Sequence, residues 1–128
     1  MVGQSGFAKL GLGAWGTWTP VFTGFSTDPT FTARYTQTGK TVIAFVDMTG
    51  GISNATTFTM TLPVAAKTGA VQRAHIRVID NNSNQDKPGM IVTRSGSTTV
   101  DLYTSLQGTG WVASSNKRAY LTITYETD

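Results

Sequence analysis

Apolar and polar residues alternate along much of the chain, which is the pattern of β-strands that bury one face and expose the other. Every second residue is apolar in residues 57–62, 73–78 and 120–126. Glycine, proline and asparagine turns separate such runs at intervals of roughly 8 to 15 residues. No stretch has the helical period of about 3.6 residues. The pattern predicts an all-β domain: an antiparallel β-sandwich, jelly-roll-like, with about eight strands.

The composition agrees with this prediction, because 23 of the 128 residues are threonine and only 13% are charged. β-branched side chains lose freedom in helices and fit pleated sheets, so threonine favours strands. The length is that of one domain. The absence of cysteine excludes disulfides and thiolate metal ligands. No apolar run is long enough to span a membrane, so no membrane insertion is expected.

Residues 1–15 differ from the rest of the chain, because they are rich in glycine and contain few apolar side chains. Such a segment cannot form a core of its own, and it lacks the apolar run of a signal peptide. We therefore divide the chain into an N-terminal arm, residues 1–15, and a β-sandwich domain, residues 16–128. The arm is either a flexible terminus or an anchor that docks onto a neighbouring subunit or a larger particle.

One predicted strand, residues 41–48, is apolar on both faces. Its even-numbered residues form one face, while Ile43 and Phe45 lie on the other face with Asp47. A strand that is apolar on both faces has to be covered on both. One face can be the core of the domain, and the second needs either a long loop or a neighbouring subunit. We expect Ile43 and Phe45 to lie in a subunit interface.

Three motifs follow one another in the first half of the domain. They are Trp-Thr-Pro at residues 18–20, a Tyr-x-x-x-Gly-x-x-Val series from Tyr35 to Val42, and Thr-Phe-x-x-x-Leu-Pro from Thr57 to Pro63. In this order they resemble a β-rich module that recurs in virion proteins of tailed bacteriophages. The resemblance covers about residues 15–65 and, loosely, the last strand, and residues 66–118 match no part of the module.

The resemblance implies a structural protein of the virion, typically a homotrimer, in a tail fibre, a spike or a surface appendage. Capsid decoration is one form of the same role, and attachment to the host is a further one. The arm would then contact other virion proteins. In that family the module usually ends a longer chain, whereas here it follows only a short arm. This difference favours a short tail or head appendage over a long fibre.

A carbohydrate-binding module is the alternative function, and two features could serve it. Trp111 lies beside glycines in the predicted loop 107–111, where its ring could stack on a sugar of a host surface glycan. Arg73, His75 and Arg77 form a basic stripe on one face of a strand. They could hold an anionic glycan or pair with acids of another subunit. The net charge of +3 is scattered, so no nucleic-acid partner is expected.

The residues for catalysis are sparse, so we predict no enzyme and no cofactor. His75 is the single histidine, and no G-x-S-x-G elbow accompanies it. Asp47 and Asp101 lie in predicted strands and would have to share a cleft to cleave a glycosidic bond. The oxygen-rich loop from Asp80 to Asp86 could hold a calcium ion, but it lacks the EF-hand spacing and we expect an exposed polar loop there.

Overall fold

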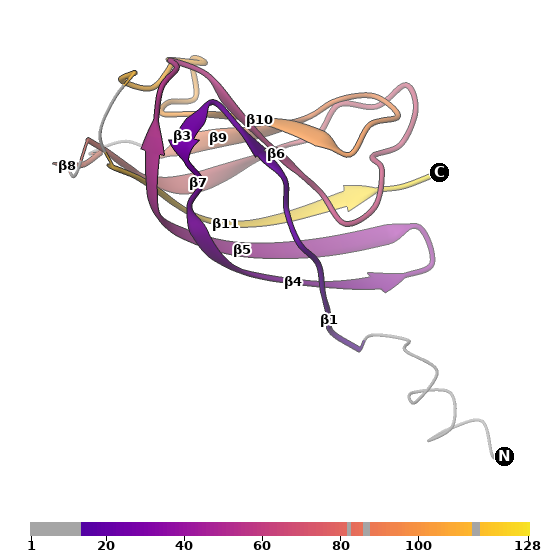
Figure 1. The fold of residues 1–128 in the computed structure, drawn as a ribbon. Coiled ribbons are helices and arrows are strands. Elements are labelled where there is room, and N and C mark those ends of the chain that lie inside the picture. The colour runs from indigo at the N-terminus through magenta and orange to yellow at the C-terminus, as the bar shows by residue number, and fades with distance from the viewer. Residues whose placement is uncertain (1–13, 82, 86–87, 114–115) are drawn as a thin grey trace, which may run out of the picture.

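The computed structural model describes residues 14–81, 83–85, 88–113 and 116–128. Within these residues the chain forms eleven strands and no helix, and therefore no helix that could cross a membrane (Figure 1). The strands are β1 (Gly16–Thr17), β2 (Phe22–Thr23), β3 (Phe25–Thr27), β4 (Thr30–Thr38), β5 (Thr41–Ser53), β6 (Phe58–Thr61), β7 (Arg73–Asp80), β8 (Ser83–Asn84), β9 (Gly89–Thr93), β10 (Thr99–Tyr103) and β11 (Asn116–Glu126). The predicted all-β class is confirmed.

All strand pairs are antiparallel and belong to one continuous sheet, in the order β1-β4-β5-β11-β7-β9-β10-β6-β2. Strand β3 pairs with the end of β5, and β8 pairs with the end of β7. The count exceeds the eight strands expected because β1, β2, β3 and β8 are only two or three residues long. Alternation over so few residues gives no signal in the sequence.

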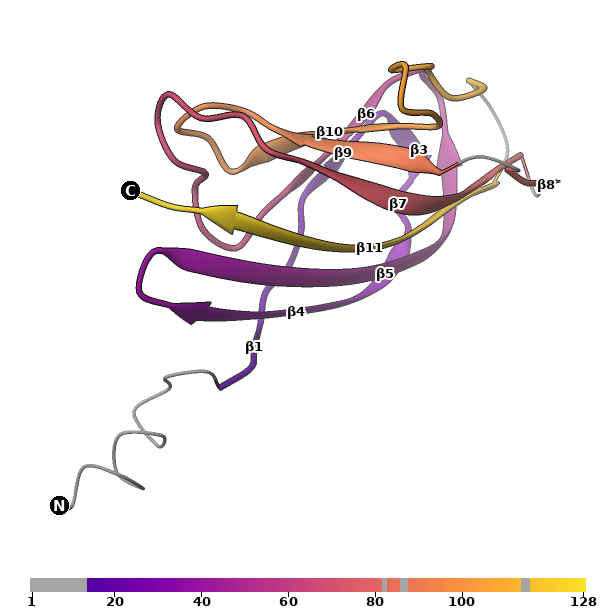
Figure 2. The same cartoon turned by 180° about the vertical axis from the view of Figure 1, so that it is seen from behind.

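Strand β7 belongs to both halves of the sheet. Its residues 77–80 pair with β11, while its residues 73–76 pair with β9. The sheet bends at this shared strand and forms a half-barrel, as the two opposite views show (Figures 1 and 2). We predicted a sandwich of two sheets, but the halves remain joined by an unbroken ladder. Periodicity identifies strands and not their neighbours, which is why the join could not be predicted.

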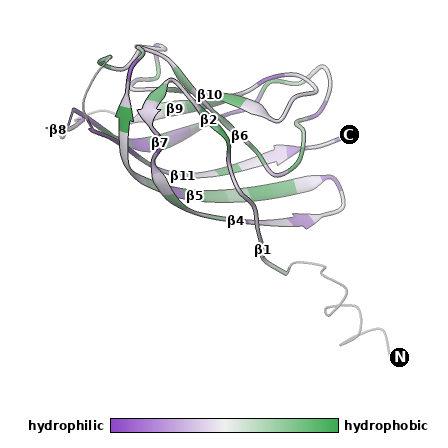
Figure 3. Ribbon diagram, in the orientation of Figure 1, coloured by the Kyte–Doolittle hydropathy of each residue, from purple (hydrophilic) through white to green (hydrophobic). Residues whose placement is uncertain are grey.

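The core lies on the concave side of the half-barrel. The even-numbered residues of β5 from Val42 to Met48 have no exposed surface, and Met60, Ile91 and Val100 on the opposite half are equally buried. Figure 3 shows hydrophobic residues, in green, along the middle of β5 and on the strands of the other half. The period-2 pattern of the sequence therefore corresponds to inward and outward positions.

The open side of the half-barrel is closed by contacts between chain segments. The Trp18 indole Nε1 donates a hydrogen bond to the Thr61 carbonyl oxygen at 3.0 Å, and its ring packs edge to face on Tyr35 at 6.0 Å. Tyr125 on β11 donates from its hydroxyl to the Val64 carbonyl at 2.7 Å. Burial raises the pKa of Tyr125 to about 12, although the hydrogen bond to Val64 acts in the opposite direction.

Candidate functional site

Trp111, which we considered as a contact for a ligand or a partner, is a core residue with only 2% of its surface exposed. Its ring centroid lies 4.3 Å from that of Phe58, and its indole Nε1 donates to the Leu102 carbonyl at 2.9 Å. Its backbone N–H donates to the Thr56 carbonyl at 2.7 Å. The glycine-rich segment folds back over the core, so the prediction that Trp111 faces solvent is wrong.

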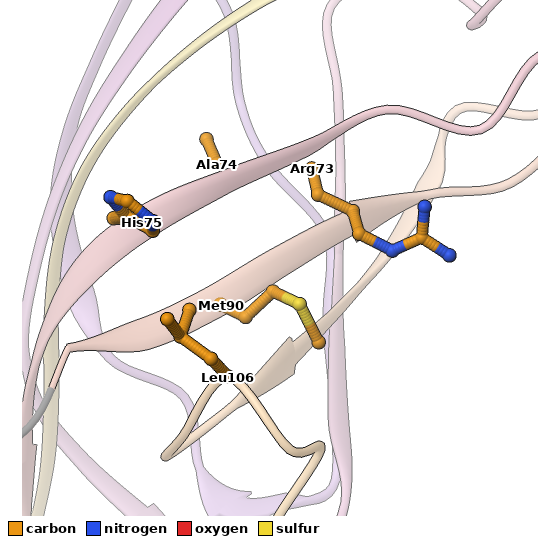
Figure 4. Close-up of a pocket in the computed structure, with 5 residues that line it drawn as sticks. All are labelled: Arg73, Ala74, His75, Met90 and Leu106. Atoms are coloured by element: carbon orange, nitrogen blue, oxygen red, sulfur yellow. The ribbon is translucent and has the colours of Figure 1, made fainter.

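The basic stripe lies on the outer face of β7, where Arg73, His75 and Arg77 are all exposed. Its members do not share one site. The Arg77 guanidinium lies 5.5 Å from the centroid of the Tyr120 ring, on the half of β7 that pairs with β11. Arg73 and His75 lie on the half that pairs with β9, and they line a pocket there (Figure 4).

This pocket has a volume of about 360 Å³ and is lined by Arg73, Ala74, His75, Met90 and Leu106. Met90 lies directly opposite His75 in the β7–β9 ladder, and Leu106 reaches over from the loop that follows β10 (Figure 4). Half of the Leu106 surface is exposed. No acidic residue lines the pocket, so its chemistry is an apolar floor beside two basic side chains.

A network of hydrogen bonds stabilises the loop that carries Leu106. The Thr104 backbone N–H donates to the Thr109 carbonyl at 2.9 Å, and the Ser105 hydroxyl donates to the Thr109 hydroxyl at 2.7 Å. A second hollow of about 320 Å³ also has Leu106 in its lining, together with Pro88, Ser105, Gln107 and Thr109. The half-exposed leucine therefore contributes to two hollows.

The two carboxylates considered for glycoside cleavage are not brought together. Asp47 lies on β5 and Asp101 on β10, with β11, β7 and β9 between these strands in the sheet. Arg94 donates to both oxygens of the Asp101 carboxylate, at 2.6 and 2.8 Å. A carboxylate held in this bidentate way is a structural partner of the arginine.

Asp80 begins the loop that we considered for a calcium ion and expected to be exposed and polar, but Asp80 itself is buried. It is 7% exposed and forms an ion pair with Lys117, whose side chain is fully buried. Its second oxygen accepts a hydrogen bond from the Val112 backbone N–H at 3.0 Å. Asp86 lies outside the described residues, and within those residues no group of three metal-ligating side chains occurs. Asp80 is thus a buried partner of Lys117, and no sequence pattern indicated this pairing.

No family model matches the sequence, and no curated protein is significantly similar to it. The function has to be argued from the surfaces of the chain itself.

A second candidate surface lies on the convex face of β4, β5 and β11. Three rows of side chains cross these strands in register: Thr36–Ile43–Thr124, Arg34–Phe45–Thr122 and Thr32–Asp47–Tyr120. We call these nine residues the outer patch. Ile43 and Phe45 at its centre are half-buried and do not belong to the core cluster. As the sequence indicated, they point away from the fully buried face of the same strand.

Two polar atoms of the outer patch lack partners. The Thr36 hydroxyl and one carboxylate oxygen of Asp47 are buried and form no hydrogen bond with any described residue. Arg34 is exposed, and its guanidinium lies 5.3 Å from the centroid of the Trp15 ring. The sequence had placed Asp47 on this face, but it gave no sign that Arg34 and Trp15 lie beside it, because those contacts depend on the pairing of β1 with β4.

Residues 1–13 of the predicted arm lie outside the described residues. Ala14 and Trp15 are exposed and lead directly into β1 at the edge of the sheet.

Proposed function

We propose that the chain is a non-enzymatic structural subunit of a tailed-phage virion, which assembles as a homotrimer on the particle surface. The role would be that of a tail fibre, spike or capsid-decoration component that also contributes to attachment to the host. Residues 1–15 would contact other virion proteins, and the mature subunit would be extracellular with the particle. The observation that carries the proposal is the outer patch, because it combines two large apolar side chains with polar atoms that lack partners.

The exposed apolar surface and the unpaired polar atoms of the outer patch support an interface. Removing apolar surface from water is favourable by about 25 cal/mol of free energy for each Å² buried. A buried polar atom without a hydrogen bond costs about 1–3 kcal/mol, and the patch holds two such atoms, on Thr36 and Asp47. A second copy that covered Ile43 and Phe45 would provide the apolar gain, and donors from that copy would lower the polar cost at Asp47 once its carboxylate turns outward.

The strand pairing supports a jelly-roll-like fold for this subunit. The pairs β5–β11, β6–β10 and β7–β9 are nested in the sequence, each inside the previous one. A long hairpin rolled onto itself has this nesting, which is the principle of the jelly roll, a fold of many capsid proteins. The threonine-rich outer faces agree with a particle surface, because hydroxyl groups bind water without adding charge.

The mass in solution tests the proposal. Light scattering after gel filtration is expected to give about three times the 13.7 kDa of the chain. The double variant Ile43→Thr with Phe45→Thr should lower that mass, whereas Val92→Thr on the outer face of β9 should not. A wild-type chain that remains monomeric at micromolar concentration would overturn the trimer and the interface together.

The pocket beside Leu106 favours a second function, the binding of an anionic glycan. Arg73 and His75 supply donors for a carboxylate, and Met90 and Leu106 supply apolar contact for a sugar ring. A chain with this function should bind acidic polysaccharide in a glycan array, and Arg73→Gln should abolish the signal. Arg77→Gln is the matched control, because Arg77 lies on the same face of β7 but over Tyr120. Equal binding by both variants would exclude the pocket.

A further inference from the structure

The outer patch carries one positive and one negative side chain next to its apolar centre. Arg34 lies directly opposite Phe45 in the β4–β5 ladder, and Asp47 lies two residues along β5. Both side chains project from the convex face, as Ile43 and Phe45 do. The patch therefore contains both halves of an ion pair, next to the apolar surface that would exclude water from it.

The Asp47 carboxylate is incompletely satisfied in the single chain. One of its oxygens is buried and accepts no hydrogen bond from a described residue. Its register partners are Thr32 on β4 and Tyr120 on β11, and neither donates to it. That oxygen is covered within the single chain, but Asp47 as a whole is partly exposed, so its carboxylate can turn outward to a donor. A guanidinium offers five N–H groups in a planar fork that matches a carboxylate.

Arg34 is the one arginine among the nine residues of the outer patch, yet it does not pair with Asp47 within the chain. Diagonal positions on paired strands are about 7–8 Å apart, which is within reach of an arginine side chain. The guanidinium lies instead over the Trp15 ring, towards the edge strand β1, and forms no ion pair with an acid of the described residues. Stacking on an aromatic ring keeps the planar group extended and exposed for an outside partner.

We propose that Arg34 of one copy pairs with Asp47 of the next copy across the subunit interface, around the apolar centre formed by Ile43 and Phe45. The inference rests on the proposed function, and it identifies the occupant of the patch as a second copy of this chain. Charge complementarity argues for this occupant, because the chain presents both charges on one face and a copy can satisfy each of them. Desolvated charge pairs of this kind fix the register of an interface.

Charge reversal tests the pairing. Arg34→Glu and Asp47→Arg should each weaken association on the order of 30-fold or more, since each places like charges together at a dry interface. The double variant with both changes should restore the wild-type mass, because the pair is then re-formed with exchanged signs. Sedimentation or light scattering over a range of concentrations measures the association. Circular dichroism and thermal unfolding check that each variant is folded.

Arg118→Glu is the matched control, because Arg118 is exposed on β11 outside the outer patch. It should leave the association unchanged. If the wild-type chain is oligomeric and Arg34→Glu associates as wild type does, this pairing is overturned and the proposed function stands. If the single variants lower the melting temperature without changing the mass, the two residues pair within one chain and the inference is again overturned. A monomeric wild-type chain overturns both proposals.

Discussion

Replacing Lys117 by methionine is the sharpest test of how this half-barrel is stabilised. The Lys117 side chain is fully buried and pairs with Asp80, which lies directly opposite it in the β7–β11 ladder. Methionine keeps most of the volume and removes the charge. The Asp80 carboxylate would then remain at 7% exposure with the Val112 backbone N–H as a donor and without its cation.

The magnitude follows from the cost of an uncompensated buried charge. Removing one partner of a buried ion pair costs about 3–5 kcal/mol, whereas removing both charges is often neutral. Lys117→Met alone should therefore lower the free energy of unfolding by about 4 kcal/mol. Adding Asp80→Asn should recover most of this loss, because the amide is neutral and its oxygen can still accept the Val112 hydrogen bond.

Urea unfolding followed by circular dichroism measures both effects. With a slope of about 2 kcal/mol per molar urea, the single variant should shift the midpoint by roughly 2 M. Arg94→Met is the control, because the Arg94 side chain is half exposed and its pair with Asp101 should contribute only about 0–1 kcal/mol. The reasoning is refuted if Lys117→Met is as stable as the wild type, or if adding Asp80→Asn lowers the stability further.

Three further substitutions have expected outcomes. Gly89→Ala should cost about 3 kcal/mol in urea unfolding, because a Cβ there would meet the backbone carbonyl of Tyr103. Trp111→Phe should cost about 2 kcal/mol, since the Leu102 carbonyl loses its donor; wild-type stability would contradict the core position of this ring. The stability of the wild type should fall between about pH 10 and pH 12, because the raised pKa of Tyr125, about 12, keeps the phenol protonated in the folded chain after the unfolded chain has lost its proton. Tyr125→Phe should abolish this fall. Thermal unfolding at several pH values measures it, and a variant whose stability still falls as in the wild type would contradict this cause.

The strands were predictable because their signal is local. Residues 73–78 and 120–126 alternate in the sequence, and they lie in β7 and β11 with the expected faces buried. The double-sided pattern of residues 41–48 likewise placed Ile43 and Phe45 opposite the core face. An alternation with a period of two residues shows which side chains share a face. It does not show which strands are neighbours. The bend at β7 therefore had no counterpart in the pattern.

The candidate sites were harder to predict, because they join residues that are distant in the sequence. The exposure of Trp111 was inferred from its glycine neighbours. Its buried position instead depends on a distant contact, because the Thr56 carbonyl accepts the hydrogen bond of its backbone N–H. The Asp80–Lys117 pair likewise depends on the β7–β11 ladder. Among the described residues the basic stripe was correctly placed on one face, but the shared strand divides it between two environments. Charge patterns along one strand cannot show such a division.

The position of β11 between β5 and β7 has a consequence for synthesis of the protein. This strand, Asn116–Glu126, follows every other strand in the chain and pairs on both sides within the sheet. On the ribosome, the β4–β5 hairpin can form early, but the inner edges of β5 and β7 have no partner until β11 emerges from the exit tunnel. Unpaired strand edges favour aggregation while they persist. Folding is therefore completed only after translation has passed this last strand, and assembly through the outer patch, which includes β11, has to follow it.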